Sequence, residues 1–373
     1  MGPVRVLFIT VRADHGGGPR HVELLLHHLS GNVVPFVACP HEEPYHARFQ
    51  SLVEADICVI PHRRFSLSAA LRLIFYVRRQ RIDIAHSHGK GAGLYARFIS
   101  LLSGIPGVHT PHGVHVSRYG RLTRQLYRAY ENGTSPLVQR VLFVSEEERV
   151  AAGRAGLWPR VGHVVISNGV EEVPDEVRMA RRAGARQALN ISERPFVIAT
   201  LTRFDYPKNM QEAYEVARRL PTALFVWAGD GPDAAGLAAK LEGEGVTNVR
   251  MTGALDDPGS LLSAADVYLS TSRWEGMPLS VLEAMAMGLP VVASDVTGHS
   301  QIVRESGGGM LYPPGDPDAA SHLLTQLLAD ESLREELGRK AREAQRGRYS
   351  ARRMADDVAR IYRELLSAPA ARK

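Results

Sequence analysis

Two glutamates in the stretch SRWEGMPLSVLEAMAMGLPVVASD, which begins at residue 272, have a spacing that could bind a sugar phosphate. Seven residues separate Glu275 from Glu283, and a helix is expected over residues 277–288, because proline is tolerated in a first helical turn and glycine often ends a helix. The unpaired N–H groups of a helix start favour a phosphate. Glu283 would lie roughly 7 Å along the axis from that start, and carboxylates accept hydrogen bonds from sugar hydroxyls. We therefore expect Glu283 to bind a ribose, Glu275 a second sugar, and the helix start the diphosphate between them.

A plainer interpretation is that both glutamates lie at the surface of a core helix. Two features argue against it: the glycine and proline before the helix, and the position of the segment directly after the strand-like residues 265–272. We therefore favour the binding interpretation.

Histidines gather at the ends of two expected neighbouring strands, in AHSHG and VHTPHGVH. The five are His86, His88, His109, His112 and His115. Such a group could bind zinc, but neither a cysteine nor a carboxylate accompanies it at a spacing typical of a metal site. The acidic segment DPD over residues 316–318 precedes a helical pattern, so Asp316 is expected to be a helix N-cap. We expect no metal and no other cofactor.

The elements that must hold these residues alternate between strands and helices along both halves of the chain. A length of 373 residues exceeds what one hydrophobic core usually supports, and such alternation indicates a parallel sheet with helices on both faces. We expect one domain over residues 1–170, a charged linker over 171–194 and a second domain over 195–350. A helix over 351–367 could pack on either domain. The expected fold is α/β, with two Rossmann-like doubly wound domains that face a central cleft.

The distribution of charge narrows the choice of partners. The net charge is +5, but residues 1–167 carry 20 basic and 11 acidic side chains. Arginines alternate with apolar residues over 63–81 and 117–130, which suggests contact with anionic lipid or with a phosphorylated acceptor. The interleaved aromatics of a nucleic-acid module are missing, so no nucleic acid is expected. Without a run of ~18 apolar residues, and with a short, strand-like amino terminus, the protein is expected to be cytoplasmic, where it could bind peripherally to the inner face of the membrane.

The segment EGMPLSVLEAMAMGLPVV resembles the E-x7-E segment of retaining glycosyltransferases with the GT-B fold, family four, also called group 1. Further motifs follow that family's order: a glycine loop after the first strand, HG, ISNGV, RFDYPKN, AGDGP and YPPGD. Each is weak alone, but the ordered set is specific. The resemblance implies transfer of a hexose from a nucleotide sugar, UDP in preference to GDP, to a glycan, lipid-linked or small-molecule acceptor. The expected process is the biosynthesis of cell-surface polysaccharide or glycoconjugate.

Individual roles are implied by the same resemblance. Arg203 and Lys208 match the R-x4-K pattern that clamps the donor diphosphate, and His112 matches the histidine that supports the donor sugar beside Glu275. Contacts with the donor are implied for the following residues: Gly16, Gly17, Gly18, Gly229, Leu255, Gly276, Met277, Pro278, Leu279 and Glu283. The route would be a front-face transfer without a metal, in which the departing phosphate helps to take the acceptor proton.

Three other functions share parts of this pattern. A nucleotide-sugar epimerase of the same fold would produce an isomer from the nucleotide sugar alone. A sugar-binding protein without catalysis would normally be exported, and a phosphorylase would need a lysine that anchors pyridoxal phosphate. The transferase is the function that we favour.

Overall fold

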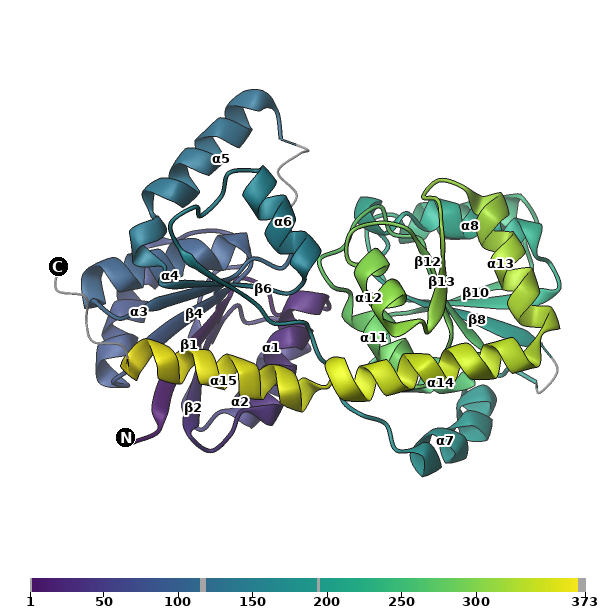
Figure 1. Ribbon diagram of the computed structural model, residues 1–373, viewed down its shortest axis with the longest axis horizontal. Coiled ribbons are helices and arrows are strands. Elements are labelled where there is room, and N and C mark those ends of the chain that lie inside the picture. The colour runs from purple at the N-terminus through teal and green to yellow at the C-terminus, as the bar shows by residue number, and fades with distance from the viewer. Residues whose placement is uncertain (1, 115–118, 193–194, 368–373) are drawn as a thin grey trace. The chain divides into compact units, whose positions relative to one another are not determined.

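The computed structural model describes residues 2–114, 119–192 and 195–367, and the chain forms two compact units (Figure 1). Unit 1 consists of Met1–Asn168 and Ala351–Lys373, and unit 2 of Gly169–Ser350. Each unit contains one fully parallel sheet with its own core. The two doubly wound α/β domains expected from the sequence are therefore confirmed.

The sheet of unit 1 has seven strands in the order β3-β2-β1-β4-β5-β6-β7. Its strands are β1 (Val4–Thr10), β2 (Val33–Cys39), β3 (Cys58–Val59), β4 (Ile84–His88), β5 (Gly107–Thr110), β6 (Arg140–Phe143) and β7 (Gly162–Val165). β1 has the bounds expected from its apolar run, and its residues Val6 to Ile9 are all 0% exposed. A strand in the middle of a parallel sheet has helices on both faces, which is why the run is apolar without alternation.

Helices cover both faces of this sheet. They are α1 (Gly17–His28), α2 (Tyr45–Leu52), α3 (Leu67–Arg79), α4 (Lys90–Ser103), α5 (Arg121–Gly133), α6 (Glu146–Arg154) and α15 (Ala351–Ser367), with a short 3-10 helix at Ser135–Leu137. The last helix of the chain belongs to unit 1, where α15 packs against α1. Its Tyr362 hydroxyl is hydrogen-bonded to Nδ1 of His86, on β4, at 2.6 Å. This buried polar contact explains how an amphipathic helix far away in the sequence is fixed to the first domain.

The sheet of unit 2 has six strands in the order β10-β9-β8-β11-β12-β13. They are β8 (Phe196–Leu201), β9 (Ala223–Ala228), β10 (Val249–Gly253), β11 (Val267–Ser270), β12 (Val291–Ser294) and β13 (Gly309–Tyr312). The helices are α7 (Asp175–Ala188), α8 (Met210–Arg219), α9 (Ala234–Gly243), α10 (Pro258–Ala264), α11 (Leu279–Ala286), α12 (His299–Ser306), α13 (Pro317–Ala329) and α14 (Glu331–Arg348), with a 3-10 helix at Tyr206–Lys208. Asp316 accepts a hydrogen bond from the Ala319 amide at 2.9 Å, which confirms the expected N-cap.

The structure differs from the expected linker over residues 171–194, because this stretch falls inside unit 2. Its helix α7 packs against α10. Arg186 donates to the Ala264 carbonyl at 3.1 Å and forms an ion pair with Asp266 at 2.9 Å. The charged composition suggested a solvated linker, but the charged side chain of Arg186 attaches α7 to the rest of unit 2.

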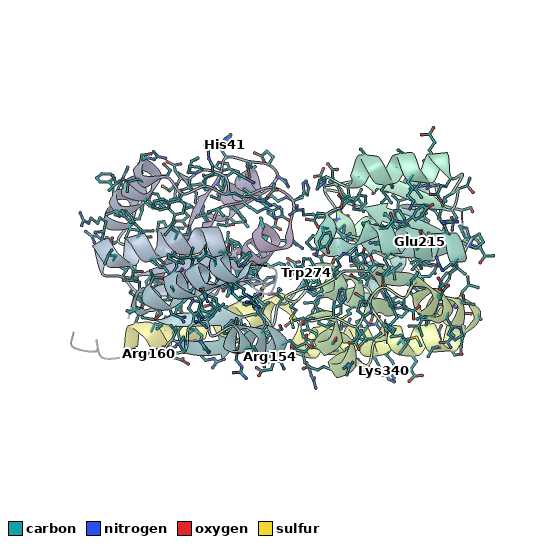
Figure 2. All side chains as sticks on the ribbon, turned by 90° about the horizontal axis from the view of Figure 1, so that it is seen from above. His41, Arg154, Arg160, Glu215, Trp274 and Lys340 are labelled. Atoms are coloured by element: carbon teal, nitrogen blue, oxygen red, sulfur yellow. The ribbon has the colours of Figure 1, made fainter. Side chains whose placement is uncertain are left out.

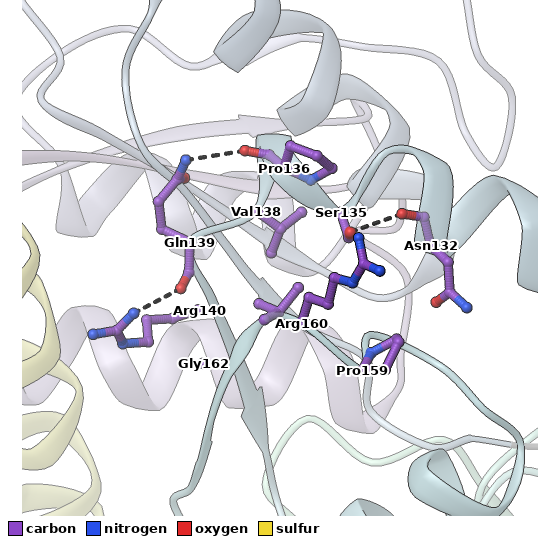
Figure 3. Close-up of a pocket in the computed structure, with 10 residues that line it drawn as sticks. Asn132, Ser135, Pro136, Val138, Gln139, Arg140, Pro159, Arg160 and Gly162 are labelled. Atoms are coloured by element: carbon purple, nitrogen blue, oxygen red, sulfur yellow. Dashed lines mark hydrogen bonds between the residues drawn. The ribbon is translucent and has the colours of Figure 1, made fainter. Parts of the chain in front are cut away.

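Both sheets reverse their strand order at one point, between β1 and β4 in unit 1 and between β8 and β11 in unit 2. In open parallel sheets, ligands bind beyond the carboxyl ends of the strands at such a reversal. A hollow of about 660 Å³ lies at the opposite edge of the unit 1 sheet, where Arg140 and Gly162 begin β6 and β7 (Figure 3). A ligand site is therefore expected at the carboxyl edges of the two sheets.

Side chains such as His41, Arg160 and Lys340 project from the ribbon (Figure 2). Among the described residues, no helix combines the length and the apolar character that crossing a membrane requires.

Candidate functional site

The loops that follow β8 and β11 are joined to each other at the strand-order reversal of unit 2. The Thr271 hydroxyl donates to the Lys208 carbonyl at 3.1 Å, and the Arg273 amide donates to the Pro207 carbonyl at 2.7 Å. These bonds explain why two loops that are far apart in the sequence act as one structural element. The loop with Arg203 and Lys208 is therefore held against the segment that contains Glu275.

Lys208 and Glu275, both expected site residues, form an ion pair. The ammonium of Lys208 donates to Oε1 of Glu275 at 2.5 Å, and the Ser272 hydroxyl donates to the same oxygen at 2.6 Å. The Glu275 side chain is only 11% exposed, and burial acts to raise its pKa. The charge of Lys208 and the two hydrogen bonds outweigh burial and bring the pKa of Glu275 below its ordinary value, so the carboxylate is ionised at neutral pH.

Glu275 is also supported from the following loop. Its amide donates to the Thr297 carbonyl at 3.0 Å. The next residue, Gly298, has a φ of +87°, and a side chain there would place its Cβ 2.8 Å from the Cβ of Glu275. Buried His299 lies below, where its ring is hydrogen-bonded to the Ser270 hydroxyl at 3.0 Å. The carboxylate of Glu275 is thus positioned by three separate loops.

Arg203 lies in the same loop as Lys208 but has a different partner. Its guanidinium forms an ion pair with Asp205 at 2.8 Å, and the side chain is 32% exposed. An arginine that is partly exposed at the carboxyl edge can bind a phosphate through a planar pair of donors. Asp205 therefore orients the first of the two expected cations.

The helix expected over residues 277–288 is shorter in the structure. α11 begins at Leu279 with Pro278 as its N-cap residue, so Met277 precedes the helix, and no side chain caps the first turn. Proline has no N–H, and its ψ of 121° is extended. Pro278 therefore offers the amides of the first turn no side-chain acceptor, an arrangement that favours an anion.

Glu283 is the fifth residue of α11, and its side chain is half-buried. Glu283 and Glu275 both act on the hydroxyl of Tyr268, the second residue of β11. Burial raises the pKa of the Tyr268 hydroxyl, and the negative charges of both glutamates raise it further. The two carboxylates therefore lie within electrostatic reach of the same buried hydroxyl.

The structure gives Gly229 a role inside the protein. Its φ is +139°, and a Cβ there would lie 1.7 Å from the Thr202 carbonyl oxygen, so glycine is needed where the loops after β8 and β9 approach each other. Leu255 lies half-buried in the loop after β10. Both lie at the carboxyl edge of the sheet. Gly229 follows β9, the neighbour of β8, and Leu255 follows β10, which is one strand further from the reversal.

The glycine loop of unit 1 differs from expectation, because Gly17 and Gly18 form the first turn of α1 rather than a turn before it. Gly16 is the N-cap residue with an extended φ of 164°. A Cβ at Gly17 or Gly18 would meet no atom of the described structure within 4 Å. Open space beside a helix start leaves room for a ligand.

His112 lies in a left-handed turn after β5, with a φ of +56°. Its Nε2 and Nδ1 of His88 are hydrogen-bonded at 3.2 Å, and its ring contacts that of His21, on α1, with centroids 4.6 Å apart. Burial lowers the pKa of His21 to about 4 and the pKa values of His88 and His112 well below their ordinary value. At neutral pH these three rings are uncharged. They surround the strand-order reversal of unit 1.

The other histidines of the expected cluster have structural partners. His86 is hydrogen-bonded to the Thr110 hydroxyl at 2.8 Å and His109 to the Ser87 hydroxyl at 2.9 Å, while His115 lies outside the described residues. One ring nitrogen each of His21, His88 and His112 lie within 4.8 Å of one another, as do one ligand atom each of Asp14, Glu42 and His62. Either group has a spacing that could hold a cation. In the first, however, the His88–His112 hydrogen bond occupies two of the ring nitrogens.

The sequence analysis missed Glu148, which holds the turn that contains His112. One oxygen of its carboxylate accepts a hydrogen bond from the Gly113 amide and the other from the Val144 amide, the latter at 2.9 Å. The signal was present as the capping box Ser145-x-x-Glu148, in which the Ser145 hydroxyl accepts the Glu148 amide at 3.1 Å. That motif predicts the start of α6, but it does not reveal that the carboxylate also bonds a loop 35 residues earlier in the sequence.

Glu148 generates a pH prediction for stability. Burial raises the pKa of its carboxyl from 4.5 to about 7. Because the folded pKa is the higher one, the associated stabilisation is complete below pH ~4.5 and is lost as the pH rises through ~7. The difference corresponds to at most about 3 kcal/mol. Urea unfolding of wild type and Glu148→Gln should show wild type losing up to this amount relative to the variant between about pH 5 and about pH 8.

The control for this measurement is Glu146→Gln, on the exposed side of the same helix. The pKa of Glu146 is lowered by its hydrogen bond with Arg149, so its contribution does not change over that pH interval. The buried histidines give the unfolding free energy the opposite pH dependence, because their contribution to stability is lost as the pH falls. They are present in all three proteins, so this effect cancels in the comparison. A constant difference between wild type and Glu148→Gln would contradict the burial of an ionisable carboxyl at this position.

Two family models match the chain. The model described as Glycosyltransferase Family 4 matches residues 15–172, and the model described as Glycosyl transferases group 1 matches residues 182–344. Among curated relatives, the alpha-D-kanosaminyltransferase of Streptomyces kanamyceticus is 29% identical over 80% of this chain and 82% of its own. The UDP-Gal:alpha-D-GlcNAc-diphosphoundecaprenol alpha-1,3-galactosyltransferase of Escherichia coli is 26% identical over 72% of each chain.

Solved structures show the same fold. Alr3699/HepE of Anabaena, in complex with UDP and glucose, has a TM-score of 0.84 at 17% identity, over 98% of this chain and 100% of that one. WaaG, a glycosyltransferase involved in lipopolysaccharide biosynthesis, has a TM-score of 0.73 at 16% identity, over 96% and 99%. Together with the two family models, which cover most of the chain in the order of its two units, these likenesses show that the chain belongs to the family-four, group 1 glycosyltransferases and has the GT-B fold.

Proposed function

We propose that the protein is a retaining hexosyltransferase that uses a UDP-sugar as donor. The observation that carries the proposal is the joined pair of loops in unit 2, where Lys208, Glu275 and the uncapped start of α11 meet at the strand-order reversal. A cation, a carboxylate and free amides are the groups that a sugar diphosphate needs. The name of the galactosyltransferase relative and the UDP in the HepE structure support UDP as the nucleotide.

In this proposal, unit 2 binds the donor. The diphosphate lies between the start of α11 and the two cations, Glu283 accepts the ribose hydroxyls, and Glu275 accepts those of the transferred sugar. The amides of Gly276 and Leu279 face the diphosphate, and the base lies near Leu255. Lys208 would exchange its contact with Glu275 for a phosphate oxygen, which leaves the carboxylate available for the sugar.

Unit 1 is proposed to bind the acceptor, with Gly16 to Gly18 beside it or beside the donor phosphate. His112 would donate a hydrogen bond to the donor sugar as an uncharged ring, and the reaction would occur when the units close on their substrates. As the glycosidic bond lengthens, negative charge grows on the departing diphosphate. Arg203 and Lys208 then stabilise the transition state more than the ground state.

Retention by double displacement would need a carboxylate nucleophile. Glu148 contacts the His112 turn, but it is 1% exposed and both of its oxygens accept backbone amides. We therefore propose a front-face route, in which the departing phosphate takes the acceptor proton. The proposed acceptor is a glycan or lipid-linked glycan, in line with the names of relatives that act on diphosphoundecaprenol and in lipopolysaccharide synthesis. The proposed location is peripheral, on the inner face of the membrane.

The donor is identified by thermal shift against UDP-, GDP- and ADP-hexoses. At 100 times its dissociation constant, a ligand adds about 2.7 kcal/mol to the unfolding free energy. We expect a UDP-hexose to give the largest shift, and NMR of the product formed with a glycan acceptor to show the donor's anomeric configuration. An inverted product would contradict retention, and conversion of the donor to an isomer without acceptor would indicate an epimerase.

A second prediction concerns Arg203 and Lys208. Arg203→Ala and Lys208→Ala should each lower kcat at least ~10²-fold, by analogy with the loss of a preorganised electrostatic donor. Arg304→Ala, which removes a 66% exposed arginine elsewhere in unit 2, is the matched control and should keep normal turnover. Since Lys208→Ala also leaves buried Glu275 unpaired, Lys208→Ala with Glu275→Gln restores neutrality for a stability check. Near-normal kcat in both single variants would remove these residues from the mechanism.

A third prediction concerns metals. Because the fixed cations and helix amides supply the positive charge, transfer should persist in excess EDTA and should not rise with added Mg²⁺ or Mn²⁺. Strict dependence on a divalent ion would contradict the proposed route. It would direct attention to the His21, His88 and His112 group or to Asp14, Glu42 and His62.

A further inference from the structure

One face of α3 exposes large apolar side chains. Leu67, Leu71 and Phe75 are 58%, 54% and 69% exposed. They are spaced by four residues, so they form a continuous stripe along the helix. The buried face of the same helix, which includes Leu73 and Val77, packs into the core of unit 1. The stripe is therefore additional to the apolar surface that folding requires.

Arginines accompany this stripe. Arg72, Arg78 and Arg79 on α3 are exposed, and residues 63–81 contain six arginines and no acidic residue. Viewed down the helix axis, with 3.6 residues per turn, Arg78 lies within the stripe, between Leu67 and Leu71. Arg72 and Arg79 lie at the edge of the stripe, next to Phe75. We call Leu67, Leu71, Phe75, Arg72, Arg78 and Arg79 the α3 face.

The neighbouring helix α4 also exposes large apolar side chains. α4 packs beside α3, and its last turn exposes Leu101 and Leu102 to 63% and 46%. In a parallel sheet the connecting helices run in the same direction, so the last turn of α4 lies at the same end as Phe75 and the two final arginines of α3. The combined surface is larger than a single helix stripe.

We infer that the α3 face docks on an anionic lipid bilayer, with the apolar stripe inserted at the level of the headgroups and the arginines among the lipid phosphates. An amphipathic helix of this type lies parallel to the membrane and buries its apolar side chains ~5–10 Å deep. Each arginine near an anionic surface adds to binding, and the contribution falls as salt screens it. The inference specifies the surface behind the peripheral location that the proposed function includes.

Charge selects lipid over the other occupants of an apolar face. A second copy of this chain, docked through the same face, would bring two sets of arginines together without an acidic residue of residues 63–81 to oppose them. A nucleic acid would satisfy the arginines but leave the leucines and Phe75 in contact with water or phosphate. Only a surface that is anionic at one depth and apolar below it fits both kinds of side chain.

α5 supplies a matched comparison within the same unit. It is also basic and exposes Leu122 and Leu126 to 69% and 62%, but this apolar surface covers two residues instead of three and has no exposed aromatic side chain. The pair Leu122→Ser and Leu126→Ser therefore removes a similar amount of exposed apolar surface from a helix that we do not assign to the membrane.

The test is co-sedimentation of the full chain with vesicles of phosphatidylcholine that contain about one third phosphatidylglycerol. At low salt we expect binding of wild type, little binding to pure phosphatidylcholine, and loss in about 0.5 M salt. Leu71→Ser with Phe75→Ser, and separately Arg72→Ser with Arg79→Ser, should weaken vesicle binding at least ~10-fold. The α5 pair should bind like wild type. All substituted residues are exposed, so circular dichroism and thermal melts should be unchanged.

Three outcomes would overturn the inference: no binding of wild type at low salt, equal binding by the α3 variants, or loss of binding only in the α5 variant. Concentration-dependent dimerisation that Phe75→Ser abolishes, without vesicle binding, would assign the face to a second copy instead. Binding of UDP-sugar by the α3 variants, followed by thermal shift, separates this result from a failure of the proposed function, because the donor residues lie in unit 2.

Discussion

The ion pair between Lys208 and Glu275 is the interaction on which the candidate site depends. A carboxylate that is 11% exposed is costly unless a charge and hydrogen bonds compensate it, and here Lys208 and Ser272 both bond the same oxygen. The pair also fixes the loop after β8 to the loop after β11, which sets the position of the α11 start. Without substrate, the two charges compensate each other. In the proposed reaction, Lys208 leaves Glu275 and contacts a phosphate oxygen of the bound nucleotide sugar. The hydroxyls of the sugar then donate hydrogen bonds to the Glu275 carboxylate in place of the lysine.

The two sheets present contrasting environments at equivalent places. Both reverse their strand order once, and both carry their chemical groups beyond the carboxyl ends next to that reversal. Unit 2 places full charges there, because its loops are partly exposed and Arg203 and Lys208 each have a counter-charge. Unit 1 places His21, His88 and His112 there, and burial keeps these rings neutral. Neutral rings can hydrogen-bond a sugar without competing with the cations for the diphosphate, which suits the proposed division of roles.

Local patterns predicted local structure well. The apolar run of β1, the N-cap at Asp316 and the place of Glu283 within α11 follow from the order of residue types over one or two turns. The sequence could not show that Glu148 bonds the Gly113 amide or that Arg186 attaches α7 to α10, because those contacts depend on which strands become neighbours. The bounds of the glycine loop were missed for another reason: Gly17 and Gly18 were interpreted as a turn, although a helix can begin with glycine where no side chain is needed.

The glycines of the site divide into two groups according to what surrounds them. Gly229 and Gly298 have positive φ values, and a Cβ at either would collide with the backbone or side chain of another loop. Glycine at these two positions is therefore required by the packing of the protein itself. Gly17 and Gly18 are helical, and a side chain there would meet open space. Glycine in a helix start costs conformational entropy without a steric return from the fold. In the proposed function, a substrate that approaches the backbone closely would use this open space. Gly229, after β9, thus serves the structure, whereas the glycines after β1 belong to the proposed ligand-binding loop.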